Sequence, residues 1–216
     1  MLNKYKYKIP KIWFYEIKGV QDVATIKELE IARKLPNMRA KIFLESRAYI
    51  RQSLAALFEL NPLEIPLIAN PGEAPLLPKG MGNISLSHCK DAIIVAWHEK
   101  QIGIDIERID RNFNYKRLAK KYFTKTNKFL INGSLNKKMI LNHWCALEAA
   151  IKWNNGKLAK EISEWQYFES KKKLIHKKKN LDLRCVQINF YQWTISIAFE
   201  YKPITTPTMI CSPKNF

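Results

Sequence analysis

The sequence predicts an α+β fold of two similar α/β subdomains, residues 1–100 and 101–216, related by pseudo-twofold symmetry. Helical hydrophobic patterns alternate with short strand patterns along the chain. A weak repeat supports two halves, because each contains a long helix, a polar or proline-rich connection and a strand of similar pattern, DAIIVAW (91–97) or WTISIAF (193–199). Ligands often bind where two such units meet, so we expect the active site in the cleft between them.

Length and charge limit the function classes. The 216 residues, 47% of them apolar, suffice for one full core or for two small cores packed together. The formal net charge of +18 predicts attraction to nucleic acid, an anionic membrane, a phosphate-rich cofactor or an acidic protein. Part of this charge lies in KKKLIHKKK (171–179), which we interpret as a solvated loop or hairpin tip. The alternative for this run is a docking patch for an acidic partner.

Cysteine usage and hydropathy indicate a reducing compartment. The four cysteines lie far apart and have no zinc-ligand spacing. The first residues lack the continuous apolar region of a signal peptide, and no apolar run approaches the roughly 20 residues that span a bilayer. We therefore expect a cytoplasmic protein that has free buried thiols and does not enter a membrane.

One long helix dominates the first half. Residues 39–60 place four apolar side chains at helical spacing, and Asn61-Pro62 follows as a stop. These side chains are Phe43, Ile50, Leu54 and Leu57. Arg47 and Arg51 lie one turn apart on the other face. Six residues of 62–78 are proline or glycine, so an extended loop is expected there.

Strand patterns follow at 91–97 and at 101–109, with a turn expected around residues 98–100. The second strand alternates strictly, so its isoleucines share one face while Gly103, Asp105 and Glu107 share the other. Helices are predicted at 115–123 and 138–153. Further strands are predicted at 164–168, 184–190 and 193–199, and the last sixteen residues resemble a tail.

The two carboxylates of the second strand are candidates for cation binding. Acids at i and i+2 on a strand lie about 6.5–7 Å apart on one face, close enough to share a hard divalent ion. Trp144, Glu148 and Lys152 follow at i, i+4 and i+8 on one helix face, so Glu148 could supply a third carboxylate. The alternatives are an exposed strand face that carries two acids and an ordinary surface Glu–Lys pair.

Together the two elements resemble the 4′-phosphopantetheinyl transferases of the surfactin-synthetase type. The matching residues are Gly103-Ile104-Asp105-Ile106-Glu107 and the W-x-x-x-E-x-x-x-K pattern of Trp144–Lys152. NISLSHC, which contains Ser87 and His88, the loop PGEAPLLP (71–78) and YFTKT (122–126) resemble further family segments in the same order. Arg51 matches an arginine of the first long helix, and the resemblance spans roughly residues 39–200.

The resemblance implies a Mg²⁺-dependent enzyme that transfers the phosphopantetheine arm of coenzyme A to a serine of an acyl or peptidyl carrier protein. Asp105, Glu107 and Glu148 would hold the ion against the pyrophosphate. Glu148 or a metal-bound water would take the serine proton, and Lys152 would steady the departing 3′,5′-ADP.

The resemblance also implies the remaining substrate contacts and the partner. Arg51 and His88 would contact the 3′-phosphate of coenzyme A, with Ser87 beside them. Carrier proteins of this system are typically acidic, and the basic charge would steer them toward the enzyme. They serve fatty-acid, polyketide or peptide synthesis. The internal repeat would let a monomer build the whole site.

Three positions depart from the family pattern. Leu147 and Ala74 stand where the family has lysines, and Asn127 stands where it has glutamate. Each lost charge-assisted contact would weaken coenzyme A binding by about 1–3 kcal/mol. A non-catalytic binder of coenzyme A or of a carrier protein is therefore one alternative. A basic nucleic-acid-binding protein is the other, although we find no recognition motif and expect no nucleic acid as partner.

Overall fold

The structure is a computed structural model that describes residues 9–17, 23–68, 70–123, 136–200 and 208–211. The chain forms two compact units. The first comprises Met1–Leu86, Asp91–Lys100 and Ile204–Phe216, and the second comprises Ser87–Lys90 and Gln101–Pro203. One break between these units falls between Lys100 and Gln101, and the division into subdomains 1–100 and 101–216 stays a prediction.

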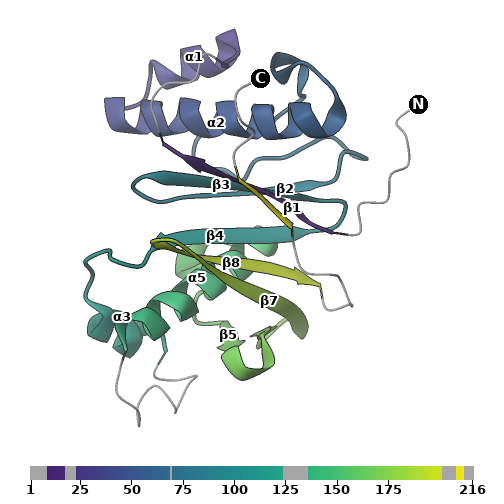
Figure 1. Cartoon of the computed structure of the whole chain (residues 1–216). Helices are drawn as coiled ribbons and strands as arrows, with labels where there is room; N and C mark the ends of the chain where they lie inside the picture. Colours follow the sequence, from purple (N-terminus) through teal and green to yellow (C-terminus); the bar gives the residue numbers. More distant parts are fainter. Residues whose placement is uncertain (1–8, 18–22, 69, 124–135, 201–207, 212–216) are drawn as a thin grey trace. The chain divides into compact units, whose positions relative to one another are not determined.

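The first unit contains a four-stranded sheet of order β2-β3-β1-β9, which α2 accompanies on one side (Figure 1). Its strands are β1 (Lys11–Glu16), β2 (Asn83–His88), β3 (Ala92–His98) and β9 (Thr208–Cys211). β1 pairs antiparallel with β3 and parallel with β9. Strand β9 corrects the expected tail over 201–216, of which residues 201–207 and 212–216 lie outside the described part.

The helices of the first unit are α1 (Ile26–Ala32) and α2 (Asn37–Phe58). α1 begins with a capping box, because the Thr25 hydroxyl accepts from the Glu28 amide and the Glu28 carboxylate accepts from the Thr25 amide. α2 confirms the predicted long helix and packs on a core of aromatic and branched side chains. This core includes Trp13, Tyr15, Tyr49, Ile50, Leu54, Ile65, Ile93, Val95 and Trp97.

The segment after α2 is more ordered than an extended loop. It contains the short 3₁₀ helix η1 (Pro62–Glu64), which Asn61 caps through its side chain. An isolated antiparallel bridge joins Ile68 to Leu76. The prolines exclude a regular α-helix here but permit a 3₁₀ turn that begins with proline.

The second unit contains a five-stranded antiparallel sheet of order β4-β8-β7-β6-β5. Its strands are β4 (Ile102–Arg108), β5 (Trp165–Phe168), β6 (Lys173–His176), β7 (Leu181–Phe190) and β8 (Trp193–Glu200). Its helices are α3 (Tyr115–Tyr122), α5 (Lys137–Trp153) and α6 (Leu158–Glu161), with η2 (Glu169–Lys171). α5 packs against β4 and β8 (Figure 1).

The lysine-rich run 171–179 contains a strand, so its interpretation as a loop or hairpin tip is wrong in its centre. β6 occupies residues 173–176 between β5 and β7, and Leu174 and His176 are buried. Three of its lysines form ion pairs: Lys173–Asp182 at 2.6 Å, Lys178–Glu164 at 2.9 Å and Lys179–Glu161 at 3.1 Å. Acidic neighbours therefore neutralise part of the charge of this run.

The strands on either side of residues 98–100 belong to different sheets. β3 pairs with β1, whereas β4 pairs with β8. The expected turn therefore connects two units and does not close a hairpin. All seven residues of β3 are buried, which accounts for its continuous apolar pattern.

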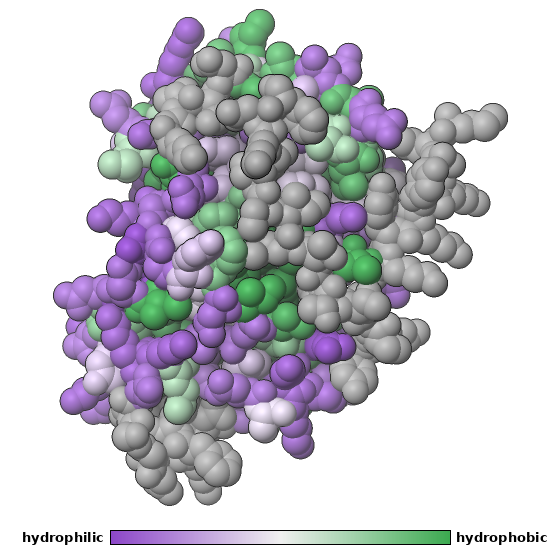
Figure 2. Space-filling view, in the orientation of Figure 1, coloured by the Kyte–Doolittle hydropathy of each residue, from purple (hydrophilic) through white to green (hydrophobic). Residues whose placement is uncertain are grey.

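The α+β class is confirmed, since each unit carries one long helix and a sheet that is wholly or mainly antiparallel. Pseudo-twofold symmetry stays a prediction. Hydrophilic residues predominate on the face shown in Figure 2, with smaller apolar areas between them. Among the helices of the described residues, none combines the length and apolarity needed to cross a bilayer.

Candidate functional site

Strand β4 and helix α5 approach each other at a glycine. A Cβ on Gly103 would lie 2.0 Å from the Ala149 carbonyl oxygen and 2.5 Å from the Trp153 amide nitrogen. The strand and the helix also exchange hydrogen bonds, from Gln101 Nε2 to the Trp153 carbonyl at 2.8 Å and from Trp153 Nε1 to the Gln101 carbonyl at 3.0 Å. Because only glycine permits this approach, α5 lies directly beside the acidic face of β4.

Asp105 is the centre of the site. The residue is 3% exposed, and Oδ1 accepts from Ser87 Oγ and from Lys152 Nζ, each at 2.7 Å. Ser87 Oγ also accepts from Lys152 Nζ at 2.7 Å, so the three groups form a closed triangle. The structure thus brings together three of the predicted site residues, from β2, β4 and α5.

The second oxygen of Asp105 has no hydrogen-bond partner among the described residues. Oδ2 is buried and accepts no hydrogen bond from any residue that the structure describes. A buried carboxylate oxygen without a partner is unfavourable, and a bound cation would remove that penalty. This oxygen is the feature of the site that best fits a bound cation.

The other two predicted carboxylates lie within electrostatic reach of Asp105. Burial, followed by the Asp105 charge, raises the pKa of Glu107, while an ion pair with Arg111 opposes the rise. Burial and Asp105 likewise raise the pKa of Glu148, to about 7. Like charges that crowd a partly buried site shift carboxyl groups in this direction. The three acids therefore form one cluster with excess negative charge.

Lys152 remains a cation in this cluster. Burial opposes its charge, but the Asp105 and Glu148 carboxylates outweigh burial and raise the pKa of Lys152. Lys152 and Arg111 each hold one oxygen of a predicted metal ligand, Asp105 and Glu107 respectively.

Within the described ranges, no group of three or more His, Cys, Asp or Glu side chains is arranged to hold a metal ion. The chemistry of the donors nevertheless fits a hard cation, because the acids supply oxygen ligands and one of these oxygens is buried and unpartnered. The residues thus fit Mg²⁺ by type and charge, without forming a finished coordination sphere.

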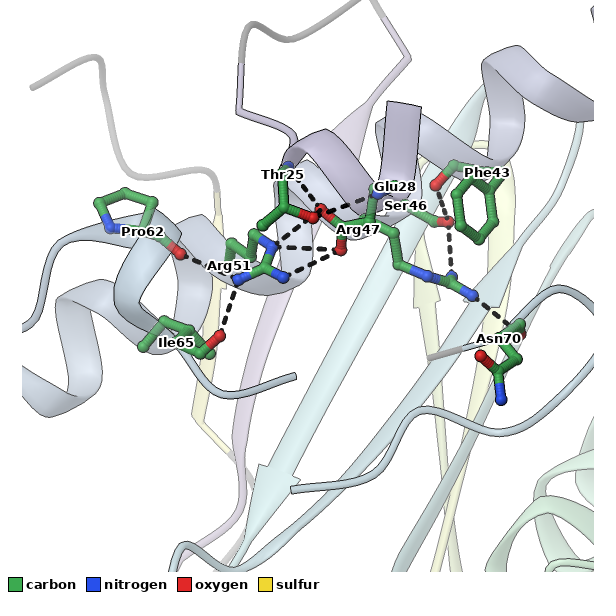
Figure 3. A network of polar contacts seen from close by, with 9 residues as sticks. All are labelled: Thr25, Glu28, Phe43, Ser46, Arg47, Arg51, Pro62, Ile65 and Asn70. Atoms are coloured by element: carbon green, nitrogen blue, oxygen red, sulfur yellow. Dashed lines mark hydrogen bonds and ion pairs between the residues drawn. The ribbon is translucent and has the colours of Figure 1, made fainter. Parts of the chain in front are cut away.

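Arg51 lies in a different network, in the first unit (Figure 3). Its Nε and Nη2 donate to the Glu28 carboxylate, and its Nη1 donates to the Ile65 and Pro62 carbonyls. All three guanidinium nitrogens thus have protein partners, and the side chain is buried rather than solvated. The structure gives Arg51 a structural role that the sequence did not predict, and its contact with a 3′-phosphate stays a prediction.

Arg47 is buried beside this network. Its burial also differs from the sequence prediction, which placed Arg47 on the polar face of the helix. It donates to Ser46 Oγ at 3.1 Å and to the Asn70 carbonyl at 3.2 Å, and its guanidinium lies over the Phe43 ring. Burial lowers the pKa of Arg47 to about 10. The two arginines therefore connect α2 to the segment that follows it (Figure 3).

His88 ends strand β2 and is exposed. Partial desolvation, and after it the Lys152 ammonium, lowers the pKa of His88. The imidazole is therefore neutral more readily than a free histidine, and its contact with a 3′-phosphate stays a prediction.

The departures from the family pattern fall in different surroundings. Leu147 is buried in the core of the second unit, so its position on α5 faces other apolar side chains. Ala74 is exposed in the segment after η1. Asn127 and most of the YFTKT segment lie outside the described residues.

Sequence reasoning missed Arg111 and the pocket that it helps to form. A pocket of about 340 Å³ lies between α3 and α5, lined by cationic, aromatic and aliphatic side chains. These are Arg111, Phe113, Asn114, Arg117, Leu118, Lys121, Tyr122, Leu141 and Trp144. The only signal in the sequence was the i, i+4 spacing of Glu107 and Arg111. This spacing predicts an ion pair in a helix but not at the end of a strand.

A family model for the 4′-phosphopantetheinyl transferase superfamily matches residues 101–201. The match contains both motifs and the described helices and strands from β4 to β8. It supports phosphopantetheinyl transfer as the class of reaction. No curated protein matches the chain.

Proposed function

We propose that the chain is a 4′-phosphopantetheinyl transferase of the surfactin-synthetase type. It transfers the phosphopantetheine arm of coenzyme A to a serine of an apo acyl or peptidyl carrier protein and releases 3′,5′-ADP. The observation that carries the proposal is the buried, unpartnered Oδ2 of Asp105 beside two further carboxylates. The superfamily match over residues 101–201 supports the reaction class.

In this proposal Asp105, Glu107 and Glu148 hold Mg²⁺. The ion would neutralise charge on the pyrophosphate of coenzyme A as the phosphoryl group transfers. Glu148 forms no hydrogen bond or ion pair with the residues that the structure describes, so its carboxylate is available to accept the serine proton.

Lys152 binds the leaving group. It carries its charge in a site that is otherwise acidic, and Ser87 and Asp105 fix its ammonium. A fixed cation stabilises the phosphate oxygens of 3′,5′-ADP without reorganising during the reaction. Ser87 and His88, at the end of β2, contact coenzyme A in the same region.

We assign an acidic carrier protein as the second substrate. The net charge of +18 supports this assignment, because complementary charge raises the rate of encounter. We further propose a monomer that acts in the cytoplasm in fatty-acid, polyketide or peptide synthesis.

Intact-mass spectrometry tests the proposal. An apo carrier protein is incubated with coenzyme A, Mg²⁺ and the chain, beside a known transferase as positive control. The carrier should gain the mass of the phosphopantetheine arm, and the gain should disappear with EDTA. Asp105→Asn and Glu148→Gln should lose transfer while their thermal unfolding shows a folded protein.

A carrier that stays apo with the wild-type chain, while the positive control succeeds, contradicts the proposal. Calorimetric titration with coenzyme A then separates the remaining possibilities. Binding without transfer identifies a non-catalytic binder, for which the missing lysines at Leu147 and Ala74 give a reason.

A further inference from the structure

The carboxylate cluster already contains two cations, and they are held very differently. Lys152 is bound to both Asp105 and Ser87, and its side chain is 29% exposed. Among the described residues Arg111 forms an ion pair with Glu107 only, and its side chain is 40% exposed. Lys152 is thus fixed in the site, whereas Arg111 is attached at its edge.

Arg111 also has a second interaction partner. Its guanidinium carbon lies 5.2 Å from the centre of the Phe113 ring, within the range of a cation–π contact. It also lines the pocket between α3 and α5, where Arg117 and Lys121 contribute further positive charge. The side chain can therefore leave Glu107 and remain partly stabilised by Phe113 and solvent.

We propose that Arg111 is a resident counter-ion, which a divalent metal ion must displace from Glu107 before all three carboxylates can act as ligands. The inference rests on the metal site of the proposed function. A guanidinium in contact with Glu107 neutralises the charge that this carboxylate offers to the ion. It also repels a second cation at short range. Arg111 thus lowers the affinity of the site for a metal ion.

The opposite role predicts the opposite sign. If Arg111 instead positioned Glu107 as a ligand, as partners of metal ligands often do, its removal would weaken metal binding. Two features favour displacement of Arg111 by the metal ion over a positioning role. Its side chain is exposed, and it carries a positive charge, whereas groups that position metal ligands are usually neutral or acidic. Measured metal affinity decides between the two roles without any activity assay.

The experiment is a titration of the full chain with Mn²⁺, followed by electron paramagnetic resonance of the free ion, with coenzyme A and carrier absent. Arg111→Gln should bind Mn²⁺ about threefold to tenfold more tightly than wild type. Arg117→Gln is the matched control, since it removes the same charge from the same pocket without touching a carboxylate; it should stay within about twofold. The gain should shrink at high ionic strength.

The outcomes separate this inference from the proposed function. Equal or weaker binding by Arg111→Gln, with Asp105→Asn abolishing binding in both backgrounds, overturns the counter-ion role and leaves the metal site in place. An equal gain in Arg117→Gln also overturns it, because the effect is then one of net charge. Absence of Mn²⁺ binding in wild type and in Arg111→Gln overturns both the inference and the metal assignment. Transfer by the wild-type chain is scored separately, by carrier mass.

Discussion

The ammonium of Lys152 lies 2.7 Å from Oδ1 of Asp105, and both groups also bond to Ser87. The pair stabilises the junction of β4 and α5, while the other Asp105 oxygen has no hydrogen-bond partner in the part of the chain that the structure describes. The Asp105 carboxylate therefore stabilises the fold through one oxygen, while its other oxygen can contact a ligand.

Removal of the lysine charge should destabilise the second unit. Lys152→Met leaves a buried carboxylate with only the Ser87 hydroxyl, and we expect the free energy of unfolding to fall by about 2 kcal/mol. Asp105→Asn in the same chain should restore part of the loss, because the buried charge of Asp105 is then removed as well. Guanidinium denaturation of the two single variants and the double variant measures the coupling. Additive losses would show that the pair contributes nothing of its own.

The Glu28–Arg51 pair should contribute mainly to stability. Both side chains are largely buried, and Arg51 also closes the segment after α2 through the Ile65 carbonyl. Glu28→Gln should therefore lower the free energy of unfolding by about 2–4 kcal/mol, because it leaves a buried guanidinium without its counter-ion. Arg39→Gln, an exposed change on the helix that carries Arg51, is the control and should stay within about 0.5 kcal/mol.

The same pair allows a test of the predicted phosphate contact. If Arg51 acts only through Glu28 and the carbonyls, Arg51→Lys should lower the unfolding midpoint without a selective loss of affinity for coenzyme A over its 3′-dephospho form. Calorimetric titration with the two ligands measures this selectivity. A selective loss of affinity for coenzyme A would support a contact between Arg51 and the 3′-phosphate.

Gly103 should not tolerate a side chain. The Cβ of Gly103→Ala would meet backbone atoms of α5, which cannot move aside as a flexible side chain could. We expect the free energy of unfolding to fall by about 2 kcal/mol or more through this overpacking. Gly80→Ala is a useful comparison, since nothing lies within 4 Å of its Cβ and only its φ of 96° is strained. Circular dichroism during urea unfolding compares the two, and an equal loss would argue against tight packing at β4.

His176 should make the second unit sensitive to acid. Its Nδ1 accepts from the amides of Lys178 and Lys179, and burial lowers the pKa of His176. The folded state therefore prefers the neutral ring. Its contribution is fully present above the ordinary histidine pKa and is lost as pH falls through the lower folded pKa.

The measurement is unfolding by denaturant between pH 8 and pH 5. Wild type should lose stability by at most about 1.4 kcal/mol per pH unit for each proton taken up. His176→Asn, which keeps an acceptor but does not titrate, should show a smaller slope. His143, whose pKa burial also lowers, stays in both chains and supplies the common background. Identical slopes would rule out His176 as the sensing group.

Local pattern sufficed for the elements that carry the motifs. The alternation of β4 predicted that Asp105 and Glu107 share one strand face, and the helical spacing of α5 predicted that Glu148 shares a helix face with Lys152, because each pattern depends only on residues within the element. The approach of the two elements was not predicted as such. It depends on Gly103, whose role is evident only once the packing of α5 on the strand is known.

Long-range pairing accounts for most of what the sequence did not reveal. β6 is a strand because β5 and β7 flank it, despite the lysines at its ends. Arg51 is buried because Glu28, on a separate helix, supplies its counter-ion. Arg111 faces Glu107 because the chain turns back after β4. For Arg51 the decisive partner lies outside the window that a sequence pattern covers, whereas Arg111 and Glu107 are four residues apart and meet through a turn that no pattern predicted.

The parallel pairing of β1 with β9 sets an order of events during synthesis. Every strand and helix of the second unit has left the ribosome once residue 200 has emerged, whereas the sheet of the first unit still lacks the edge strand formed by residues 208–211. The segment synthesised first therefore completes its sheet last. Between those two moments the nascent chain presents the open edge of β1, where chaperones or other nascent chains would be able to pair with it.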